Sequence, residues 1–173
     1  IGANLRDKIK IGVSGKITTG FDMARAMALG ADWCNAARGF MFSIGCIQAQ
    51  QCHTDRCPTG VATQDATRQH AISVSTKSER VASFHKETVK ALAELVAAAG
   101  LNHPGDLRPD LFMHRAAPDR TITFAELYRC MMPGELLAGT AQKLYREAWE
   151  LAQVNSFSPQ VTRSVLPTSI AAE

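Results

Sequence analysis

Three cysteines fall within twelve residues of this chain, and they constrain its structure more than any other feature. The run Cys46–Cys57 reads CIQAQQCHTDRC, so five residues separate the first pair and four separate the second. Thiolates this close in sequence can converge on one metal centre. Iron–sulfur clusters are held by cysteine thiolates, and Pro58 after the last cysteine would turn the chain away from a cluster. The spacing favours an iron–sulfur site, in which three ligands suit a three-iron cluster, or a four-iron cluster with one outside ligand.

Two other interpretations of this run stay open at this level. A zinc ion could take Cys46, Cys52, Cys57 and His53 as its four ligands, although zinc sites usually pair cysteines two to four residues apart. A disulfide between two of the cysteines would instead leave the third as a spare thiol. The spacing alone does not separate these alternatives.

The composition is that of an ordinary globular protein. The chain has 173 residues, 46% hydrophobic and 20% charged, which is enough for one domain with an apolar core. The net charge of +3 is spread out, so neither nucleic acid nor a membrane surface is an expected partner. No apolar stretch approaches the roughly 20 residues that span a bilayer, and no signal peptide is visible. An odd total of five cysteines, three of them clustered, predicts a reducing, cytoplasmic compartment.

The first fifty residues alternate between strand and helix. Period-two and helical patterns predict strands at Lys8–Ser14 and Asp32–Ala37, each followed by a helix, at Phe21–Leu29 and Phe40–Gln50. Cys46 would lie near the end of the second helix. This rhythm is typical of a parallel α/β fold, and two such units cannot cover their own sheet, so we expect them to need neighbours.

The two strand–helix turns are candidate phosphate sites. Ser14–Lys16 forms the first turn, and Arg38 with Gly39 forms the second. A glycine turn at a helix start presents backbone N–H groups and the positive end of the helix dipole, and both favour an anion. In β/α barrels, phosphates commonly bind at the loops after the last two strands. The alternative is that Gly15 and Gly39 only make tight connections and that both cations face solvent.

Downstream of the cysteines the sequence predicts one irregular loop and then helices. Residues 58–75 are polar and are expected to wrap the metal site. A long helix is predicted from Thr76, which has capping-box spacing to Glu79, as far as Gly100. His85 lies beside the apolar stripe of this helix, and we expect a packed or half-exposed residue, not a ligand.

The last third of the chain is predicted to be loop-rich and helical. Thr123 and Glu126 repeat the capping-box spacing and predict a short helix over Phe124–Met131, on which Cys130 would be a small buried hydrophobe. The remaining patterns predict a loop over 103–119, a helix over Thr140–Gln153 and a disordered tail, rich in Ser, Thr and Pro, over 154–173.

One stretch resembles a known family. From Gly12 to Asp65 the chain reads GVSGKITTGFDMARAMALGADWCNAARGFMFSIGCIQAQQCHTDRCPTGVATQD, which is similar to the C-terminal part of the synthase domain of glutamate synthase. It looks most like the FMN-binding glutamate-synthase-like family of bacteria and archaea. The resemblance covers residues 5–100 strongly and the segment FAELYRCMMPGELL more loosely. The cysteine spacing followed by PxGVATQD is its most specific part.

The resemblance implies both a fold and a set of cofactor ligands. In that family the domain is an eight-stranded β/α barrel, with FMN at the C-terminal ends of its strands and a three-iron, four-sulfur (3Fe-4S) cluster beside it. It implies Cys46, Cys52 and Cys57 as cluster ligands, and so iron in place of zinc. The implied FMN-phosphate residues are Ser14, Gly15 and Lys16 after the seventh strand and Ala37, Arg38 and Gly39 after the eighth. Some relatives carry Asp-Gly-Gly where this chain has Ser-Gly-Lys, so the first contact would be less glycine-rich.

The same resemblance implies a division of the chain. Residues 1–100 would be a partial (β/α)8 TIM barrel of about two β/α units, residues 101–153 a helical C-terminal extension and residues 154–173 a tail. A whole barrel takes about 250 residues, so six β/α units would lie upstream. The start at Ile1 instead of methionine agrees with that expectation. We expect the isolated chain to be inactive and poorly folded.

The implied function is glutamate synthesis. Ferredoxin or an NAD(P)H-dependent subunit would pass electrons through the cluster to FMN, which would reduce 2-iminoglutarate, formed from 2-oxoglutarate and ammonia or glutamine. His53 and Thr54 are placed to donate hydrogen bonds to cluster sulfur. No residue here is assigned as a catalytic acid or base. Two alternatives are a small Fe–S or zinc-binding electron-carrier or scaffold module without flavin, and an FMN barrel of the hydroxy-acid-oxidase type, which would not need clustered cysteines.

Overall fold

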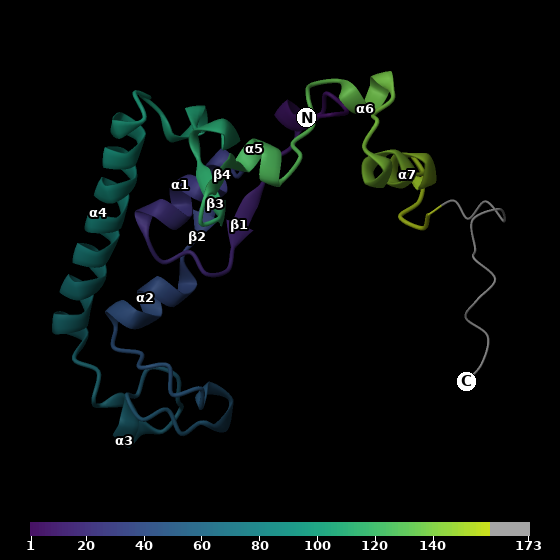
Figure 1. Cartoon of the computed structure of the whole chain (residues 1–173). Coiled ribbons are helices and arrows are strands. Elements are labelled where there is room, and N and C mark those ends of the chain that lie inside the picture. The colour runs from purple at the N-terminus through teal and green to yellow at the C-terminus, as the bar shows by residue number, and fades with distance from the viewer. Residues whose placement is uncertain (160–173) are drawn as a thin grey trace. The chain divides into compact units, whose positions relative to one another are not determined.

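The computed structural model describes residues 1–159 (Figure 1). Its elements are β1 (Gly12–Ser14), α1 (Gly20–Ala28), β2 (Trp33–Asn35), α2 (Ala37–Ser43), α3 (Ala66–Gln69), α4 (Val74–Ala98), β3 (Met113–Ala117), β4 (Arg120–Thr123), α5 (Phe124–Leu127), α6 (Glu135–Ala138) and α7 (Lys143–Leu151). Most of the tail predicted to be disordered, residues 160–173, lies outside the described residues.

The chain divides into two compact units. One spans Lys10–Arg129, and the other combines Ile1–Ile9 with the chain from Cys130 onward. The first unit therefore includes residues 101–129, which the sequence analysis placed in a separate extension. It also contains all nine of the predicted site residues.

Strand, helix, strand and helix follow one another at the start of the first unit, as predicted for an α/β protein. β1 and β2 pair in parallel, with Gly12 opposite Trp33 and Ser14 opposite Asn35. Both strands are shorter than predicted, because Arg6–Lys8 forms a 3-10 turn and the extended pairing starts only at Gly12. A Cβ on Gly12 would lie 2.5 Å from the Trp33 indole, so glycine is needed where the two strands approach.

The apolar core of the first unit lies where α1 packs against α4. The cluster there consists of Ala24, Ala28, Leu92, Val96 and Leu107, and a second, smaller cluster contains Ile17, Ala26 and Ala31. Small residues on α1 allow the close approach, and a Cβ on Gly20 would meet the Leu92 backbone nitrogen at 2.8 Å. Figure 1 shows α4 running beside both α1 and α2, with the segment that contains α3 beyond the end of α2. α4 thereby joins the two β/α units to the segment that follows the cysteines.

Three helices end in the same way, at a glycine in the left-handed region. Gly30, Gly45 and Gly100 have φ of 109°, 109° and 73°. After α2, the Gly45 N–H donates to Phe42 O and the Cys46 N–H donates to Met41 O, at 3.0 and 2.9 Å. This pair of backbone hydrogen bonds is a Schellman cap. The predicted helix over Phe40–Gln50 is therefore wrong at both ends, because α2 starts at Ala37 and Cys46 lies outside it.

The long helix is confirmed, although its predicted start is wrong. α4 begins at Val74 after Ser73, so Thr76 lies inside the helix and is not its cap. The Thr76 hydroxyl lies 3.2 Å from that of Ser73. Residues 58–75, predicted to be irregular, contain the single turn α3. His85 is exposed and stacks against Phe40, with ring centroids 6.1 Å apart, which agrees with a packing residue.

A β-hairpin replaces much of the loop predicted over 103–119. β3 and β4 pair antiparallel, with Met113 opposite Thr123 and Ala117 opposite Arg120. Most of β3 is exposed, so it shows no alternation between apolar and polar residues that could have revealed it. The predicted capping box is confirmed: Thr123 N donates to Glu126 Oε2 at 2.7 Å and Glu126 N donates to Thr123 Oγ1 at 3.2 Å.

The second unit contains two short helices where one longer helix was predicted. α6 was missed, and α7 is shorter than the predicted Thr140–Gln153. Thr140 is buried and donates its hydroxyl to Glu135 at 2.5 Å, so it links the two helices instead of continuing α7. α5 ends at Leu127, so the prediction of Cys130 as a buried helical residue is wrong, because Cys130 is exposed.

Candidate metal centre and flavin site

The three clustered cysteines surround one small cavity. Cys46 follows the end of α2, Cys52 starts a 3-10 turn (Cys52–Thr54), and Cys57 precedes a tight turn to Gly60. All three line the same cavity, together with Ile47, Ala49, Gln50, Gln51, Pro58 and Thr59. Cys57 is buried, Cys46 is half-buried and Cys52 is exposed. All three cysteines therefore border one cavity, and their role as ligands stays a prediction.

The backbone of this loop is held in a rarely adopted conformation. Gln48, Gln50 and Asp55 have φ of 57°, 56° and 61°, in the left-handed region that disfavours residues other than glycine. Such residues persist only when their surroundings fix them, and they tend to cluster at functional sites. Three such residues therefore fall between Cys46 and Cys57.

Asp55 and Thr63 tie the cysteine loop to the segment that follows it. The Thr63 hydroxyl donates to Asp55 O at 2.7 Å and contacts Asp55 Oδ1 at 3.0 Å, and the Gln64 N–H donates to the same carboxylate oxygen. Hydrogen bonds from Gln64 and Thr63 lower the pKa of Asp55. Thr63 Oγ1 also accepts from Asp65 N at 3.1 Å, and Asp65 caps α3. We call these hydrogen bonds, which run from Asp55 through Thr63 to Asp65, the Asp55–Thr63 relay. The sequence analysis missed it, although three residues of the GVATQD segment take part in it.

Gly60 allows the chain to close behind Cys57. Its φ is 77°, and a Cβ there would lie 2.2 Å from Arg68 O, which belongs to the rigid turn of α3. The Gly60 N–H donates to Cys57 O at 3.2 Å. No L-residue with a side chain fits this position without moving α3.

The sulfur of Cys57 has polar neighbours that the sequence analysis did not identify. Thr59 Oγ1 lies 3.5 Å from Cys57 Sγ. This hydroxyl and the backbone N–H groups of Ala62, Thr59 and Val61 lower the pKa of the Cys57 thiol to about 7. At the first cysteine, the Gln48 N–H points to Cys46 Sγ at 3.5 Å. Donors at sulfur stabilise thiolate, which is the form that binds metal.

The donors predicted for the cluster sulfurs are arranged differently. The Thr54 hydroxyl donates to Gln51 O at 2.8 Å and accepts from Arg56 N at 3.3 Å, so it stabilises the turn instead of a sulfur. His53 is exposed. The hydroxyl at sulfur comes from Thr59 on the far side of Cys57, two residues along the chain.

The three cysteines share a cavity without forming a ready-made site for one metal ion. In the described part of the chain, no group of three or more His, Cys, Asp and Glu side chains is arranged to hold one metal ion. In a cluster each thiolate would bind a different iron. The three sulfurs would therefore need to face a common space but would not need to converge on one point. That space is about 10 Å³ here, roughly the room of one water, so the loop must open to admit a cluster.

Both predicted phosphate turns lie at the same end of the parallel strand pair. Ser14 and Asn35 are paired residues at the carboxyl ends of β1 and β2, and the two turns leave from there. Gly15 and Lys16 have φ of 98° and 56°, and Lys16 is exposed. This edge of a parallel sheet is where α/β proteins commonly bind ligands.

The start of α1 is already occupied by a carboxylate. Asp22 Oδ2 accepts from Thr18 N, Thr19 N and both threonine hydroxyls, at 2.9–3.1 Å. Burial raises the pKa of Asp22, but these hydrogen bonds outweigh burial and lower the pKa overall. A second anion at this helix end would meet a negative charge, so a phosphate near the first turn would depend on the backbone of Gly15 and on Lys16.

The second set of predicted residues forms the first turn of α2 and not a free turn. Ala37, Arg38 and Gly39 are helical, and Gly39 is buried. A Cβ on Gly39 would lie 2.6 Å from the ring of Phe84 on α4, so helix packing explains this glycine. The first N–H groups of a helix have no intrahelical acceptor, so Ala37 and Arg38 still present donors.

One cavity connects the start of α2 with the cysteine loop. Its volume is about 380 Å³, and its lining residues are Ala37, Arg38, Met41, Phe42, Cys46, Gln48, Gln50 and Cys52. Residues predicted for flavin and for iron therefore face the same space. Because Cys46 and Cys52 line this cavity and also the one between the three cysteines, the two candidate cofactor sites are direct neighbours.

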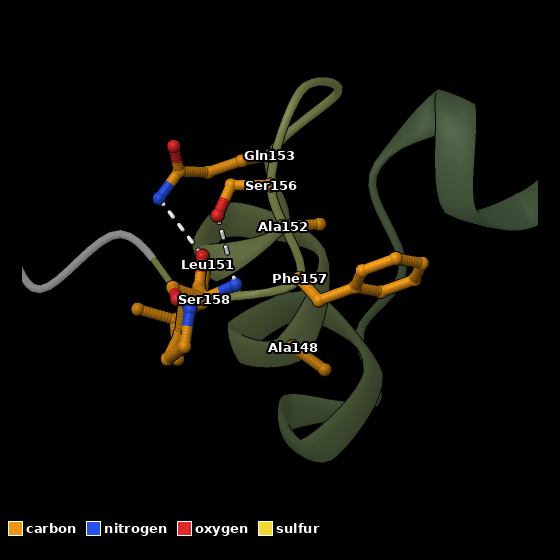
Figure 2. Close-up of a pocket in the computed structure, with 8 residues that line it drawn as sticks. Ala148, Leu151, Ala152, Gln153, Ser156, Phe157 and Ser158 are labelled. Atoms are coloured by element: carbon orange, nitrogen blue, oxygen red, sulfur yellow. Dashed lines mark hydrogen bonds between the residues drawn. The ribbon is translucent and has the colours of Figure 1, made fainter.

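A separate cavity in the second unit offers little chemistry. It lies where α7 ends and measures about 440 Å³, and Figure 2 shows its lining. The polar groups there bond to one another: Gln153 Nε2 donates to Ser158 O, and Ser158 N donates to Ser156 Oγ. None of the predicted site residues lines it, and we assign it no role.

Comparison with known proteins defines the class of this chain. The family described as the conserved region in glutamate synthase matches residues 1–102. The chain therefore belongs to the glutamate synthase family.

Individual relatives agree with that assignment. The glutamate synthase large subunit-like protein YerD of Bacillus subtilis is 51% identical over 100 residues, which are 58% of this chain and 19% of that protein. The archaeal glutamate synthase [NADPH] of Methanocaldococcus jannaschii is 35% identical over 104 residues, 60% of this chain and 20% of that protein. The chloroplastic ferredoxin-dependent glutamate synthase 2 of Arabidopsis thaliana is 44% identical over 64 residues, 37% of this chain and 4% of that protein.

The match covers only part of each relative. The chain spans about a fifth of the length of the bacterial and archaeal proteins. Within residues 1–159, no helix combines the length and the apolar character needed to cross a bilayer.

Proposed function

We propose that this chain is part of a glutamate synthase, an oxidoreductase that reduces 2-iminoglutarate to glutamate with electrons from ferredoxin or NAD(P)H. The names of its relatives support the proposal, since they include ferredoxin-dependent, NADH and NADPH glutamate synthases. The observation that carries it is that Cys46 and Cys52 line both the cysteine cavity and the cavity that reaches Arg38.

The cysteine loop would hold a 3Fe-4S cluster. Cys46, Cys52 and Cys57 would each supply one thiolate, and the donors at two of these sulfurs favour the ionised form. When bound, the cluster would supply one-electron transfer and the flavin two-electron transfer. The loop positions the thiols, and the Asp55–Thr63 relay fixes the loop.

The adjoining edge of the strand pair would hold the phosphate of FMN. Lys16 and Arg38 would provide positive charge, and the backbone of Gly15 and of the first turn of α2 would provide N–H donors. Asp22 would keep the phosphate away from the end of α1. We propose Ser14, Gly15, Lys16, Ala37, Arg38 and Gly39 as the phosphate edge, with Gly39 acting through the packing of α2 and not through contact.

The strand pair would be the last two β/α units of a (β/α)8 barrel. Ile11 and Trp33 are 37% and 47% exposed, and large apolar side chains beside short parallel strands call for covering neighbours. We assign no catalytic acid or base to this chain. Its proposed contribution is to bind the cofactors and set the distance between them.

Anaerobic reconstitution with iron, sulfide and FMN tests the proposal, carried out on the full-length protein that contains this sequence. We expect about three irons per chain, an electron paramagnetic resonance (EPR) signal of an oxidised three-iron cluster and quenched flavin fluorescence. Replacing Cys46, Cys52 and Cys57 by serine should abolish iron uptake, whereas the control Cys34→Ser with Cys130→Ser should leave it unchanged.

The same experiment separates the alternatives. Iron uptake without flavin binding would favour an electron-carrier module. Stoichiometric zinc with no iron uptake would favour a structural zinc site. Flavin binding that survives while no variant or wild-type chain takes up iron would favour an FMN barrel without a cluster.

A further inference from the structure

The three proposed ligands are not equivalent, because only two of the sulfurs have a hydrogen-bonding neighbour two residues along the chain. At Cys46 that neighbour is the Gln48 N–H, and at Cys57 it is the Thr59 hydroxyl, each 3.5 Å from sulfur. The backbone N–H groups of Ala62, Thr59 and Val61 also reach the sulfur of Cys57. Thr59 adds a side-chain hydroxyl to these donors, so its contribution can be removed by a substitution.

The direction of the Thr59–Cys57 hydrogen bond follows from the chemistry of the ligand. Between a thiol and a hydroxyl, either group can donate. A thiolate that binds iron carries no proton, so the Thr59 hydroxyl must then be the donor. The bond withdraws negative charge from sulfur, and it therefore favours the cluster state that carries one more electron.

Burial makes this hydrogen bond more consequential than it would be at the surface. Cys57 is 8% exposed, and Thr59 is half-buried beside it. Electrostatic effects are stronger where water is excluded, and the exposed Cys52 offers no comparable environment. Thr59 is therefore the side chain best placed to influence the cluster without binding iron.

We propose that Thr59 is a positioning residue, which orients the Cys57 thiolate and raises the reduction potential of the cluster by donating its hydroxyl hydrogen bond to Cys57 Sγ. This inference rests on the proposed function, since it assumes a cluster held by Cys57. No contact between Thr59 and the substrate or flavin is involved.

The test is a redox titration of the reconstituted full-length protein, with dithionite as the one-electron reductant and EPR as the readout. Thr59→Val removes the hydroxyl and keeps the side-chain shape, and it should lower the equilibrium constant for one-electron reduction about three- to tenfold; tenfold corresponds to about 59 mV. Thr59→Ser keeps the hydroxyl and should titrate like the wild type.

Thr54→Val is the matched control. This threonine lies in the same loop, but its hydroxyl donates to Gln51 O and not to a sulfur, so its loss should leave the potential unchanged. A wild-type potential in Thr59→Val with its cluster intact would overturn the proposal, as would an equal shift in Thr54→Val. If Thr59→Val fails to assemble a cluster while Thr59→Ser succeeds, the hydroxyl is shown to hold the ligand.

Failure of the proposed function would look different. In that case the wild-type chain would take up no iron under the same conditions, and the inference would fall with it. A wild-type chain with a cluster, together with an unshifted Thr59→Val, would leave the proposed function standing and reject only the role of Thr59.

Discussion

The first unit contains two regions that are held together by different forces. Where α1 meets α4, apolar side chains such as Ala24 and Leu92 are 0% and 7% exposed. In the cysteine segment, residues 46–65, the buried positions are Cys57, Gly60 and Thr63, and the order comes from hydrogen bonds and turns. The helical core is held by apolar packing, whereas under the proposed function a bound cluster would add stabilisation to the cysteine segment. Four experiments test this contrast.

The largest expected effect is on the helical core. Leu92→Ala should lower the free energy of unfolding by about 2–5 kcal/mol, because the surrounding helices cannot close the cavity it leaves. Urea unfolding followed by circular dichroism measures this. Val89→Ala, 45% exposed on the same helix, is the control and should cost far less. Loss of iron uptake by still-folded Leu92→Ala would show that the two regions are not independent.

Loading with iron and sulfide should stabilise the cysteine segment and leave the helical core unchanged. Iron and sulfide at about 100 times their dissociation constant should stabilise the cysteine segment by about 2.7 kcal/mol. Hydrogen exchange measured by mass spectrometry should therefore slow by roughly a hundredfold in residues 46–65, with little change in α1 and α4. Equal protection of both regions would contradict the contrast.

A glycine pair tests whether the turn at residue 60 is built around the absence of a side chain. Gly60→Ala places a Cβ 2.2 Å from Arg68 O, whereas Gly100→Ala, at a similar φ of 73°, meets nothing within 4 Å. Both variants should lose about 1 kcal/mol or more of unfolding free energy, because a residue with a side chain is strained in the left-handed region. Only Gly60→Ala should also weaken iron binding, by roughly tenfold in a competition with a chelator. Equal iron affinity of the two variants would rule out the clash.

The smallest expected effect is at the cap of α1. Asp22→Asn should cost about 1 kcal/mol at pH 7, as for other caps. Because the folded pKa of Asp22 lies below its ordinary 3.8, the stabilisation is present above that value and is lost as the pH falls through the folded pKa. The unfolding free energies of the wild type and of Asp22→Asn should therefore approach each other as the pH falls. The exposed Glu94→Gln serves as a control, and a difference in stability that does not narrow as the pH falls would contradict this account.

The elements that could be predicted from sequence are those with a local signal. The α4 stripe, the Thr123–Glu126 capping box and the Gly30 helix end were all correctly inferred. Gly45 gives the same signal as Gly30, yet the predicted helix extended past it to Gln50. Thr76 has capping-box spacing without being a cap, because spacing alone does not fix where a helix begins.

The candidate site was only partly predictable. The three clustered cysteines line one cavity, because they lie within twelve residues of one another, whereas their role as ligands stays a prediction. The contacts of Thr63 with Asp55, and of Gly39 with Phe84, depend on how segments fold back or pack, which no local pattern records. The hairpin at 113–123 was missed because its strands are mostly exposed and lack apolar alternation.

The relay from Asp55 through Thr63 to Asp65 has a consequence for protein design. Its hydrogen bonds join residues of one short stretch to each other, so the stretch brings its own scaffold. At its start, the stretch follows the glycine cap after α2. Residues 46–69 could therefore be transplanted onto another helix that ends at a left-handed glycine, and the host would need to provide little more than that terminus.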